Sequence, residues 1–472
     1  MDDLIKLSAR EAVARLRERA LSPLELIDAA SRRIGEAEPA INALPTLCLE
    51  RARRRARALM ADPPEDPPPG YLHGLPIAVK DLVAVAGVRT TQGSPLYADA
   101  VPEHSDYLVE TLERNGAVVI AKSNTPEFGA GSHTFNEVFG HTNNPWNTAL
   151  SAGGSSGGAA AALAAGEVWL ATGSDLGGSL RNPASFCSVV GLRPSPGRVA
   201  HGPGVLPFND LPVDGPMART VGDTALMLDA QVGRHPGDPL SLEAPTTPFL
   251  DAFIDPKPPG RVAFSADLGF MPVEPEVAEI CAGAAQAFTS LGATVEQACI
   301  DFTGAADIFH VLRAQMFAAT KADLLDHRDQ LKPEVIWNIE AGLALSVDQI
   351  AGALRARGAL YQRAVRFFED HDLLLCPAAI VPPFDGALRY PSEVAGHKFE
   401  HYTGWLMICG AITLTGCPAA SIPCGFTDDG RPVGLQVVGP PRGEAQVISA
   451  ATLFEAAHDF AAMVPIDPKP GP

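Results

Sequence analysis

The sequence predicts an α/β fold in which a large mixed central β-sheet is flanked by helices. Short β-rich runs alternate with helix-like runs from about residue 72 onward, separated by glycine-marked turns, as in a sheet covered by helices. Two other regions instead have apolar residues at helical spacing. They are an N-terminal helical arm, residues 1–60, and a helical insertion at about 270–370.

The arm contains a helix start at Ser22-Pro23, where a capping serine precedes a proline of the first turn. A proline-rich stretch at 61–70 is a stiff connector to the body. We expect the arm to pack on one α/β core that spans 61–472 and carries the insertion. The strand-like runs of this core are Ile77–Val79, Ala117–Ile120, Val168–Thr172, Arg261–Phe264, Leu373–Cys376, Ala419–Pro423 and Val433–Val438.

Composition restricts the classes of function. With 472 residues and 46% hydrophobic content, the chain can bury a substantial core. The net charge of −19 argues against nucleic acid and anionic membranes as partners, and it leaves small neutral substrates open.

The eight cysteines form no CxxC pair and have no zinc-type spacing. We therefore expect buried thiols rather than a disulfide scaffold or a metal site. The first residues lack the basic and apolar segments of a secretion signal, and the apolar stretch 407–426 is interrupted by Gly and Pro as in a buried strand and turn. These features predict a cytoplasmic protein.

A glycine-rich segment, SAGGSSGGAAAALAAG at 151–166, precedes an alanine-rich helix. Backbone amides at such a helix start can bind an anion, but the GK[ST] ending of a P-loop and a GxGxxG pattern are missing. The segment also fits GxSxG with Ser156 as the nucleophile of an α/β-hydrolase elbow. That elbow follows a hydrophobic strand, whereas residues 142–152 are polar and turn-prone. Neither the nucleotide site nor the elbow is favoured.

Two further segments carry residues suited to catalysis. In GSDLGGSLRNP, residues 173–183, the glycines before Ser179 can turn successive N–H groups in one direction, as an oxyanion hole requires. In GLPIAVKD, residues 74–81, Lys80 ends an apolar strand-like run, an unusual place for a flexible cation unless it is buried. Considered singly, an ordinary glycine turn and a surface lysine remain open.

Together the three segments resemble the amidase signature family in order, wording and spacing, within a signature region at about 72–200. LSPLELIDAASRRIGEAEPAINAL at 21–44 and the later LLLCPA and GCPAASIP segments resemble the same family, so the likeness covers nearly the whole chain. The resemblance implies the amidase signature fold and a serine hydrolase that cleaves amide-like bonds. It implies no cofactor and no metal.

The resemblance also implies residue roles. Ser179 is the expected nucleophile, Ser155 the bridging serine, joined to Gly154 by a cis peptide, and Lys80 the terminal base. The backbone N–H groups expected to form the oxyanion hole belong to Leu176, Gly177, Gly178 and Ser179. Many members have Thr or Ile where this chain has Leu176, which matters little because only the backbone is needed. The residues expected to support the turn and the loop are Asp175, Arg181 and Ser156.

A serine hydroxyl needs a base to remove its proton as it attacks. No histidine lies within the three motifs, and a lysine can serve only when neutral, which requires its pKa to fall from about 10.4 through burial or a nearby positive charge. We therefore expect Lys80 to be buried.

The pocket residues that the resemblance suggests are Phe128, Gly129, Ala130, Gly131, Ser132, Tyr402 and Trp405. They are small or apolar, without Arg or Lys to hold a carboxylate, which favours a neutral, fairly hydrophobic amide, anilide or carbamate. For Trp405, core packing is an open alternative.

The family also includes a component of the glutamyl-tRNA amidotransferase that works as a glutaminase within a complex, but the segment Asp210–Arg219 looks more like the stand-alone amidases. A non-catalytic scaffold would not need all three of the catalytic side chains, and a homodimer is an expectation from the family.

Overall fold

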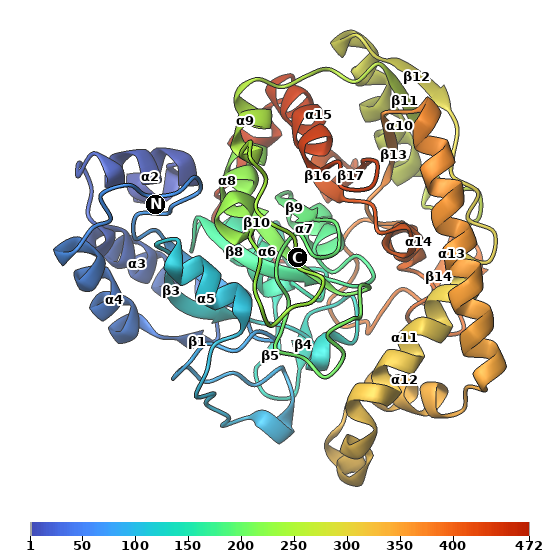
Figure 1. Ribbon diagram of the computed structural model, residues 1–472, viewed down its shortest axis with the longest axis horizontal. Coiled ribbons are helices and arrows are strands. Elements are labelled where there is room, and N and C mark those ends of the chain that lie inside the picture. The colour runs from blue at the N-terminus through green and yellow to red at the C-terminus, as the bar shows by residue number, and fades with distance from the viewer. Residues whose placement is uncertain (1, 472) are drawn as a thin grey trace.

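The computed structural model describes residues 2–471, and its centre is an eleven-stranded mixed β-sheet (Figure 1). The strands of this sheet are β1 (Thr46–Leu47), β2 (Pro76–Lys80), β3 (Val118–Ser123), β8 (Leu170–Asp175), β9 (Val190–Arg193), β10 (Val213–Ala218), β11 (Arg261–Phe264), β12 (Thr294–Gln297), β13 (Leu373–Pro377), β16 (Ala419–Phe426) and β17 (Pro432–Val438). Their order across the sheet is β1-β3-β2-β8-β10-β9-β16-β17-β13-β11-β12. The predicted fold class is confirmed.

Strand direction brings the three motifs to one edge of the sheet. Strand β2 is parallel to β8, so both strands end on the same side, with Lys80 as the last residue of β2 and Asp175 as the last of β8. Strand β10 is antiparallel to β8 and begins at this edge, where Val213 pairs with Asp175. The residues directly after β8 and those directly before β10 therefore lie near the end of β2.

Helices cover the sheet and extend at both ends of the molecule. Their bounds are α1 (Asp3–Lys6), α2 (Ala9–Arg17), α3 (Pro23–Ile41), α4 (Leu49–Ala61), α5 (Tyr107–Arg114), α6 (Gly157–Ala165), α7 (Arg181–Cys187), α8 (Val221–Gln231), α9 (Phe249–Ile254), α10 (Pro275–Ala287), α11 (Ala305–Lys321), α12 (Pro333–Leu343), α13 (Val347–Asp370), α14 (Met407–Thr415) and α15 (Glu444–Ala456). Figure 1 shows α2–α4, in blue, at one side of the molecule and α11–α13, in yellow to orange, at the other.

Local signals account for two helices near the motifs. Ser22 caps α3 through a reciprocal capping box with Glu25, and Pro23 occupies the first turn, as predicted. Every residue of α6 is buried, which its composition permits because Gly and Ala let a helix approach its neighbours closely. Helix α6 thereby fixes the loop before it, which carries Ser155 and Ser156.

All seven predicted strand runs lie within or overlap strands of the sheet, but the sequence did not reveal β1, β9, β10 or β12. Strand β10 contains Gly215 and Pro216, residues that normally weigh against a central strand, and here its pairing with β8 outweighs that local preference. Strand β12 lies inside the predicted helical insertion and pairs with β11 at the outer edge of the sheet. Six of the eight cysteines are buried, and none of the eight forms a disulfide. Between residues 2 and 471 no helix combines the length and the apolar character needed to cross a membrane.

Candidate active site

Lys80 is fully buried at the end of β2, and its amine is surrounded by hydroxyl groups. Its Nζ lies 2.8 Å from Oγ of Ser155, 2.9 Å from Oγ of Ser156 and 3.0 Å from Oγ of Ser174. Burial lowers the pKa of Lys80 to about 7, although the carboxylates of Asp214 and Asp175 act in the opposite direction. A substantial fraction of neutral amine therefore exists near neutral pH, as a lysine base requires.

Ser155 and Ser156 both face Lys80, from the loop before α6. The peptide bond between Gly154 and Ser155 is cis, as the resemblance implied. Ser156 is fully buried and its Oγ also accepts a hydrogen bond from the amide of Ser174 at 3.3 Å. Its hydroxyl is therefore enclosed, which argues against Ser156 as an exposed elbow nucleophile.

Ser179 lies in the turn after β8, and this turn contacts the loop of Ser155. The amide of Ser156 donates to the carbonyl of Ser179 at 3.2 Å, and Ser179 is half-buried while Ser155 is only 2% exposed. Within residues 2–471 the Ser179 hydroxyl makes no hydrogen bond, so Lys80 and Ser155 are hydrogen-bonded to each other whereas the hydroxyls of Ser155 and Ser179 are not.

The turn between β8 and α7 leaves amides free where an oxyanion could bind. In the described chain the N–H groups of Leu176, Gly177 and Ser179 make no hydrogen bond. Gly178 differs from the prediction, because its N–H donates to Oδ1 of Asp175 at 2.9 Å. The carboxylate folds back on its own turn and occupies that amide, so three of the four expected donors remain available.

Asp175 and Arg181 hold this turn in shape. Arg181 donates to both oxygens of Asp175, at 2.9 Å from Nε and 2.8 Å from Nη2, and Arg193 also approaches the carboxylate, with both side chains of each pair buried. Burial alone raises the pKa of Asp175, but the two guanidinium groups and the Gly178 amide outweigh it and lower the pKa well below its ordinary value. The carboxylate stays ionised and the turn is braced from two sides.

Helices distant in sequence close over the glycine turn. A Cβ atom on Gly177 would lie 2.9 Å from side-chain atoms of Leu406 and Phe309, and one on Gly178 would lie 2.6 Å from Cβ of Cys409. Helices α11 and α14 therefore pack directly on the turn and leave no space for larger residues.

We expect Gly178→Ala to reduce catalytic turnover by at least about 100-fold, since the turn would have to move and misalign the amides. Gly178 also has a φ of 108°, which L side chains rarely adopt, so the variant should melt at a lower temperature. Gly283→Ala in α10 is the matched control, because a Cβ there meets nothing within 4 Å and alanine favours a helix. Steady-state kinetics and thermal melts of both variants test the expectation; equal activity of the two would contradict it.

The predicted pocket segment 128–132 lies against the serine loop. A Cβ on Gly129 would lie 3.4 Å from Oγ of Ser155, and one on Gly154 would lie 2.9 Å from the carbonyl carbon of Ser132. The fold also brings in cations that the segment itself lacks, because Lys321 lies over the ring of Phe128 at 4.2 Å.

Lys332 is the second such cation. Its Nζ donates to the carbonyl of Ala130 at 3.1 Å and lies 4.0 Å from the carboxylate of Glu334. Burial lowers the pKa of Lys332 to about 8. Because Lys332 already has these partners, it is not positioned as a free cation for binding a substrate carboxylate.

Tyr402 and Trp405 are both buried in a second core cluster together with Phe309 and Leu406. The Tyr402 hydroxyl accepts from Arg313 and Asn338, each at 2.7 Å. Packing therefore accounts for both aromatic residues, and their connection to the glycine turn is indirect, through Phe309 and Leu406.

The structure adds residues that the sequence reasoning missed. Ser174 contacts the Lys80 amine, and its place one residue before the recognised Asp175 is a signal that could have found it. Asp214 is buried and its charge acts on the same amine, and nothing local in the sequence marks it.

His133 is a buried histidine next to Gly154, but its Nδ1 is hydrogen-bonded to Ser151 and its Nε2 to the Gly386 carbonyl. Burial lowers the pKa of His133 to about 4, and with both nitrogens engaged it is poorly placed to act as a base.

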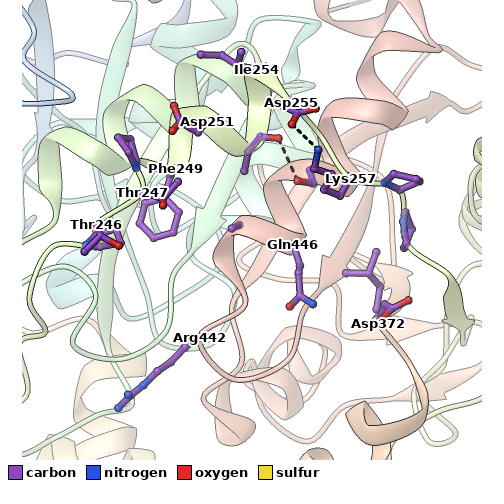
Figure 2. A pocket seen from close by; sticks show the side chains of 18 of the residues that line it. Thr246, Thr247, Phe249, Asp251, Ile254, Asp255, Lys257, Asp372, Arg442 and Gln446 are labelled. Carbon is purple, nitrogen blue, oxygen red and sulfur yellow. Dashed lines mark hydrogen bonds and ion pairs between the residues drawn. The ribbon is translucent and has the colours of Figure 1, made fainter.

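A cavity of about 830 Å³ lies away from this centre, between α9, α15 and the chain after α9. Figure 2 shows its lining, with Lys257 paired to Asp255, Phe249 on α9 and Gln446 on α15. None of the serine and lysine residues described above lines it. The cavity therefore does not contribute to the catalytic cluster.

Comparisons with known proteins show the family of this chain. The family model described as Amidase matches residues 25–448. An acylamidase of Rhodococcus erythropolis is 36% identical over 98% of this chain and 97% of the relative. The A-type component of the glutamyl-tRNA(Gln) amidotransferase of Moorella thermoacetica is 35% identical over 97% of this chain and 98% of the relative.

Solved structures of amide hydrolases superpose on this chain over nearly its whole length. A bacterial aryl acylamidase belonging to the amidase signature enzymes superposes with a TM-score of 0.89 at 29% identity, covering 98% of this chain and 99% of that one. The 6-aminohexanoate cyclic dimer hydrolase bound to its substrate superposes with a TM-score of 0.85 at 26% identity, over 98% and 99% of the two chains. The chain belongs to the amidase family and is a hydrolase that acts on the carbon–nitrogen bond of amides.

Proposed function

We propose that this amidase cleaves its substrate by acyl transfer to Ser179, with protons passing through Ser155 to Lys80. The observation that carries the proposal is that the buried Lys80 amine lies 2.8 Å from the Ser155 hydroxyl. Ser155 stands on a loop whose next residue, Ser156, donates its amide N–H to the carbonyl of Ser179. A buried amine with a pKa of about 7 can accept a proton at neutral pH. The hydroxyls of Ser156 and Ser174 hold its other side.

In the first step the Ser179 oxygen attacks the amide carbonyl as its proton moves to Ser155 and that of Ser155 moves to Lys80. The two hydroxyls must come into contact for this step, and such catalytic hydrogen bonds often shorten only once substrate is bound. The negative carbonyl oxygen would be stabilised by the free amides of Leu176, Gly177 and Ser179.

In the second step the carbon–nitrogen bond breaks, and the leaving amine takes a proton that returns from Lys80 through Ser155. Water then attacks the acyl-enzyme with the same relay acting as base, which releases the acid and restores the Ser179 hydroxyl. Each proton taken up by Lys80 is thereby returned within one turnover.

For the substrate we propose a small, neutral and fairly apolar amide or anilide, with carbamates as a further class. The small and apolar segment 128–132 beside Ser155 supports this choice, as do the relatives named as an acylamidase and an aryl acylamidase. The net charge of −19 and the eight unpaired cysteines support a cytoplasmic enzyme without a nucleic-acid partner.

A second candidate is a glutaminase component that acts within a complex. Several relatives named as the A-type component of a glutamyl-tRNA(Gln) amidotransferase are 31–35% identical to this chain, a level close to that of the acylamidase. The two candidates differ in whether the purified chain acts alone, and in whether its preferred substrate is glutamine.

The experiment is a hydrolysis screen of the purified chain across acetanilides, aryl carbamates, short linear oligoamides and glutamine, with oligomeric state measured by size exclusion. We expect turnover of a neutral anilide or amide by the isolated protein and stoichiometric labelling of Ser179 by a fluorophosphonate, located by peptide mass spectrometry. Activity on glutamine alone, gained only on adding partner proteins, would favour the second candidate. No labelling of Ser179 would contradict both.

A further inference from the structure

Asp214 is a buried carboxylate that the proposed relay does not use, although its charge acts on Lys80. It lies in β10 directly opposite Ser174 of the antiparallel strand β8. Residues paired in this way carry their side chains on the same face, with Cβ atoms about 4.5–5.5 Å apart. Oγ of Ser174 is 3.0 Å from Nζ of Lys80, so the cross-strand neighbour of Asp214 is in direct contact with the amine.

His201, in the loop between β9 and β10, is the ion-pair partner of Asp214. Its Nδ1 lies 2.7 Å from Oδ2 of Asp214, while the side chain is 48% exposed to solvent. Its own amide donates to Asp238 at 2.9 Å, which anchors the loop. The pair thus connects the surroundings of Lys80 to the surface.

Two other carboxylates close to Lys80 are already paired with buried cations. Asp175 is bonded to Arg181 and approached by Arg193, as described above. The neighbouring Asp81 is 3.2 Å from Lys122, a pair that is fully buried. Asp214 has no guanidinium or ammonium partner in the described chain, and its balancing charge is the half-exposed imidazole of His201.

We propose that Asp214 and His201 act together as positioning residues that set the charge state of Lys80, with Asp214 favouring the ammonium form and His201 offsetting Asp214. The proposal rests on the proposed function of Lys80 as the base. Asp214 is the foremost charge that raises the pKa of Lys80 against the effect of burial. The pair would thereby place the acid limit of the enzyme's working range.

His201 carries its charge around the acid limit of that range. Burial acts to lower the pKa of His201, but the carboxylates of Asp214, Asp106 and Asp238 outweigh it and raise the pKa to about 9. Asp106 faces the same group, and burial raises its own pKa to about 6. Near pH 7 the imidazole is therefore positive and Asp214 is neutralised locally.

Substitutions of Asp214 and of His201 should shift the acid limb of the pH profile in opposite directions. The neutral amine is the active form, so kcat/KM should fall below pH about 7 in the wild-type enzyme, tenfold for each unit once Lys80 is mostly protonated. Asp214→Asn removes the charge that favours the ammonium and should move this acid limb down by about one pH unit. His201→Gln leaves Asp214 unbalanced and should move the limb up, by up to about one unit.

The experiment compares kcat/KM from pH 5 to 9 for the wild type, Asp214→Asn, His201→Gln and the double variant, each normalised to its own plateau. The double variant should behave like Asp214→Asn, since His201 acts through Asp214. Asp238→Asn is the matched control. It removes the weakest of the three carboxylates that raise the pKa of His201, and the side-chain oxygen of Asn can still accept from the His201 amide. His201 should therefore stay charged at the acid limb, and the limb should coincide with that of the wild type.

Each outcome decides the proposal. Opposite shifts of the two single variants, with the double variant following Asp214→Asn, support it. Unmoved limbs, shifts in the same direction, or an equal shift in Asp238→Asn overturn it, as does a double variant that follows His201→Gln. A wild-type profile with no acid limb, or turnover that persists in a variant without Lys80, would instead refute the proposed relay, so the two failures can be told apart.

Discussion

Ser179→Ala is expected to reduce amide hydrolysis by at least about 10⁴-fold, because the attacking oxygen is lost and water would have to attack the substrate directly. The change removes a half-buried hydroxyl that has no hydrogen-bond partner in residues 2–471, so the fold should be unaffected. Substrate binding should also persist, since the contacts that bind the substrate before it reacts do not depend on this oxygen. Turnover and fluorophosphonate labelling, measured together, check the expectation.

The matched control is Ser290→Ala, an exposed serine in the 3₁₀ turn after α10. It should retain wild-type turnover, labelling and melting temperature. A Ser179→Ala enzyme that still hydrolyses amide at a rate within tenfold of the wild type would show that another residue, such as Ser155, attacks the substrate. In that case the labelled peptide would contain residues 154–156 instead.

Lys80→Met is expected to cause a loss of similar size on amide substrates. The amine both receives the proton of the nucleophile and returns one to the leaving nitrogen, and methionine keeps the volume but has no basic site. Three hydroxyls are hydrogen-bonded to Nζ, and the variant removes the partner that they share. Some loss of stability should therefore accompany the kinetic effect. The kinetic loss should be much larger than the stability change accounts for at 25 °C.

The leaving group separates the two roles of Lys80. A p-nitrophenyl ester leaves as a weakly basic phenolate that needs little help from a proton, so its hydrolysis should suffer less than that of the matching anilide. Lys80→Arg should be as inactive on anilides as Lys80→Met, since a guanidinium stays protonated throughout this pH range. Lys257→Met, at an exposed ion pair, controls for the loss of a lysine elsewhere. Substantial anilide turnover by Lys80→Arg would mean that a positive charge, rather than a base, is required.

The sequence by itself determined the elements and the identity of the reactive groups. The capping serine and proline at Ser22-Pro23 start α3 because their effects are local, and the β-rich runs became strands of the sheet for the same reason. The three glycine- and lysine-bearing motifs could be recognised because their backbone and side-chain requirements fall within a few adjacent residues. Strands such as β10 escaped detection because Gly215 and Pro216 point away from a strand until β8 is present to pair with it.

Only the tertiary structure decided how those groups work together. Lys80 and Ser155 are 75 residues apart and meet because β2 and β8 end at one edge of the sheet beside α6. The capture of the Gly178 amide by Asp175 and the cover of the turn by Phe309 and Leu406 depend on packing that no local pattern encodes. Burial lowers the pKa of Lys80 and Asp214 raises it, and the place of Asp214 opposite Ser174 follows from strand pairing. Burial and electrostatic contact are properties of the assembled sheet, so the sequence could name the participants but not their protonation or their geometry.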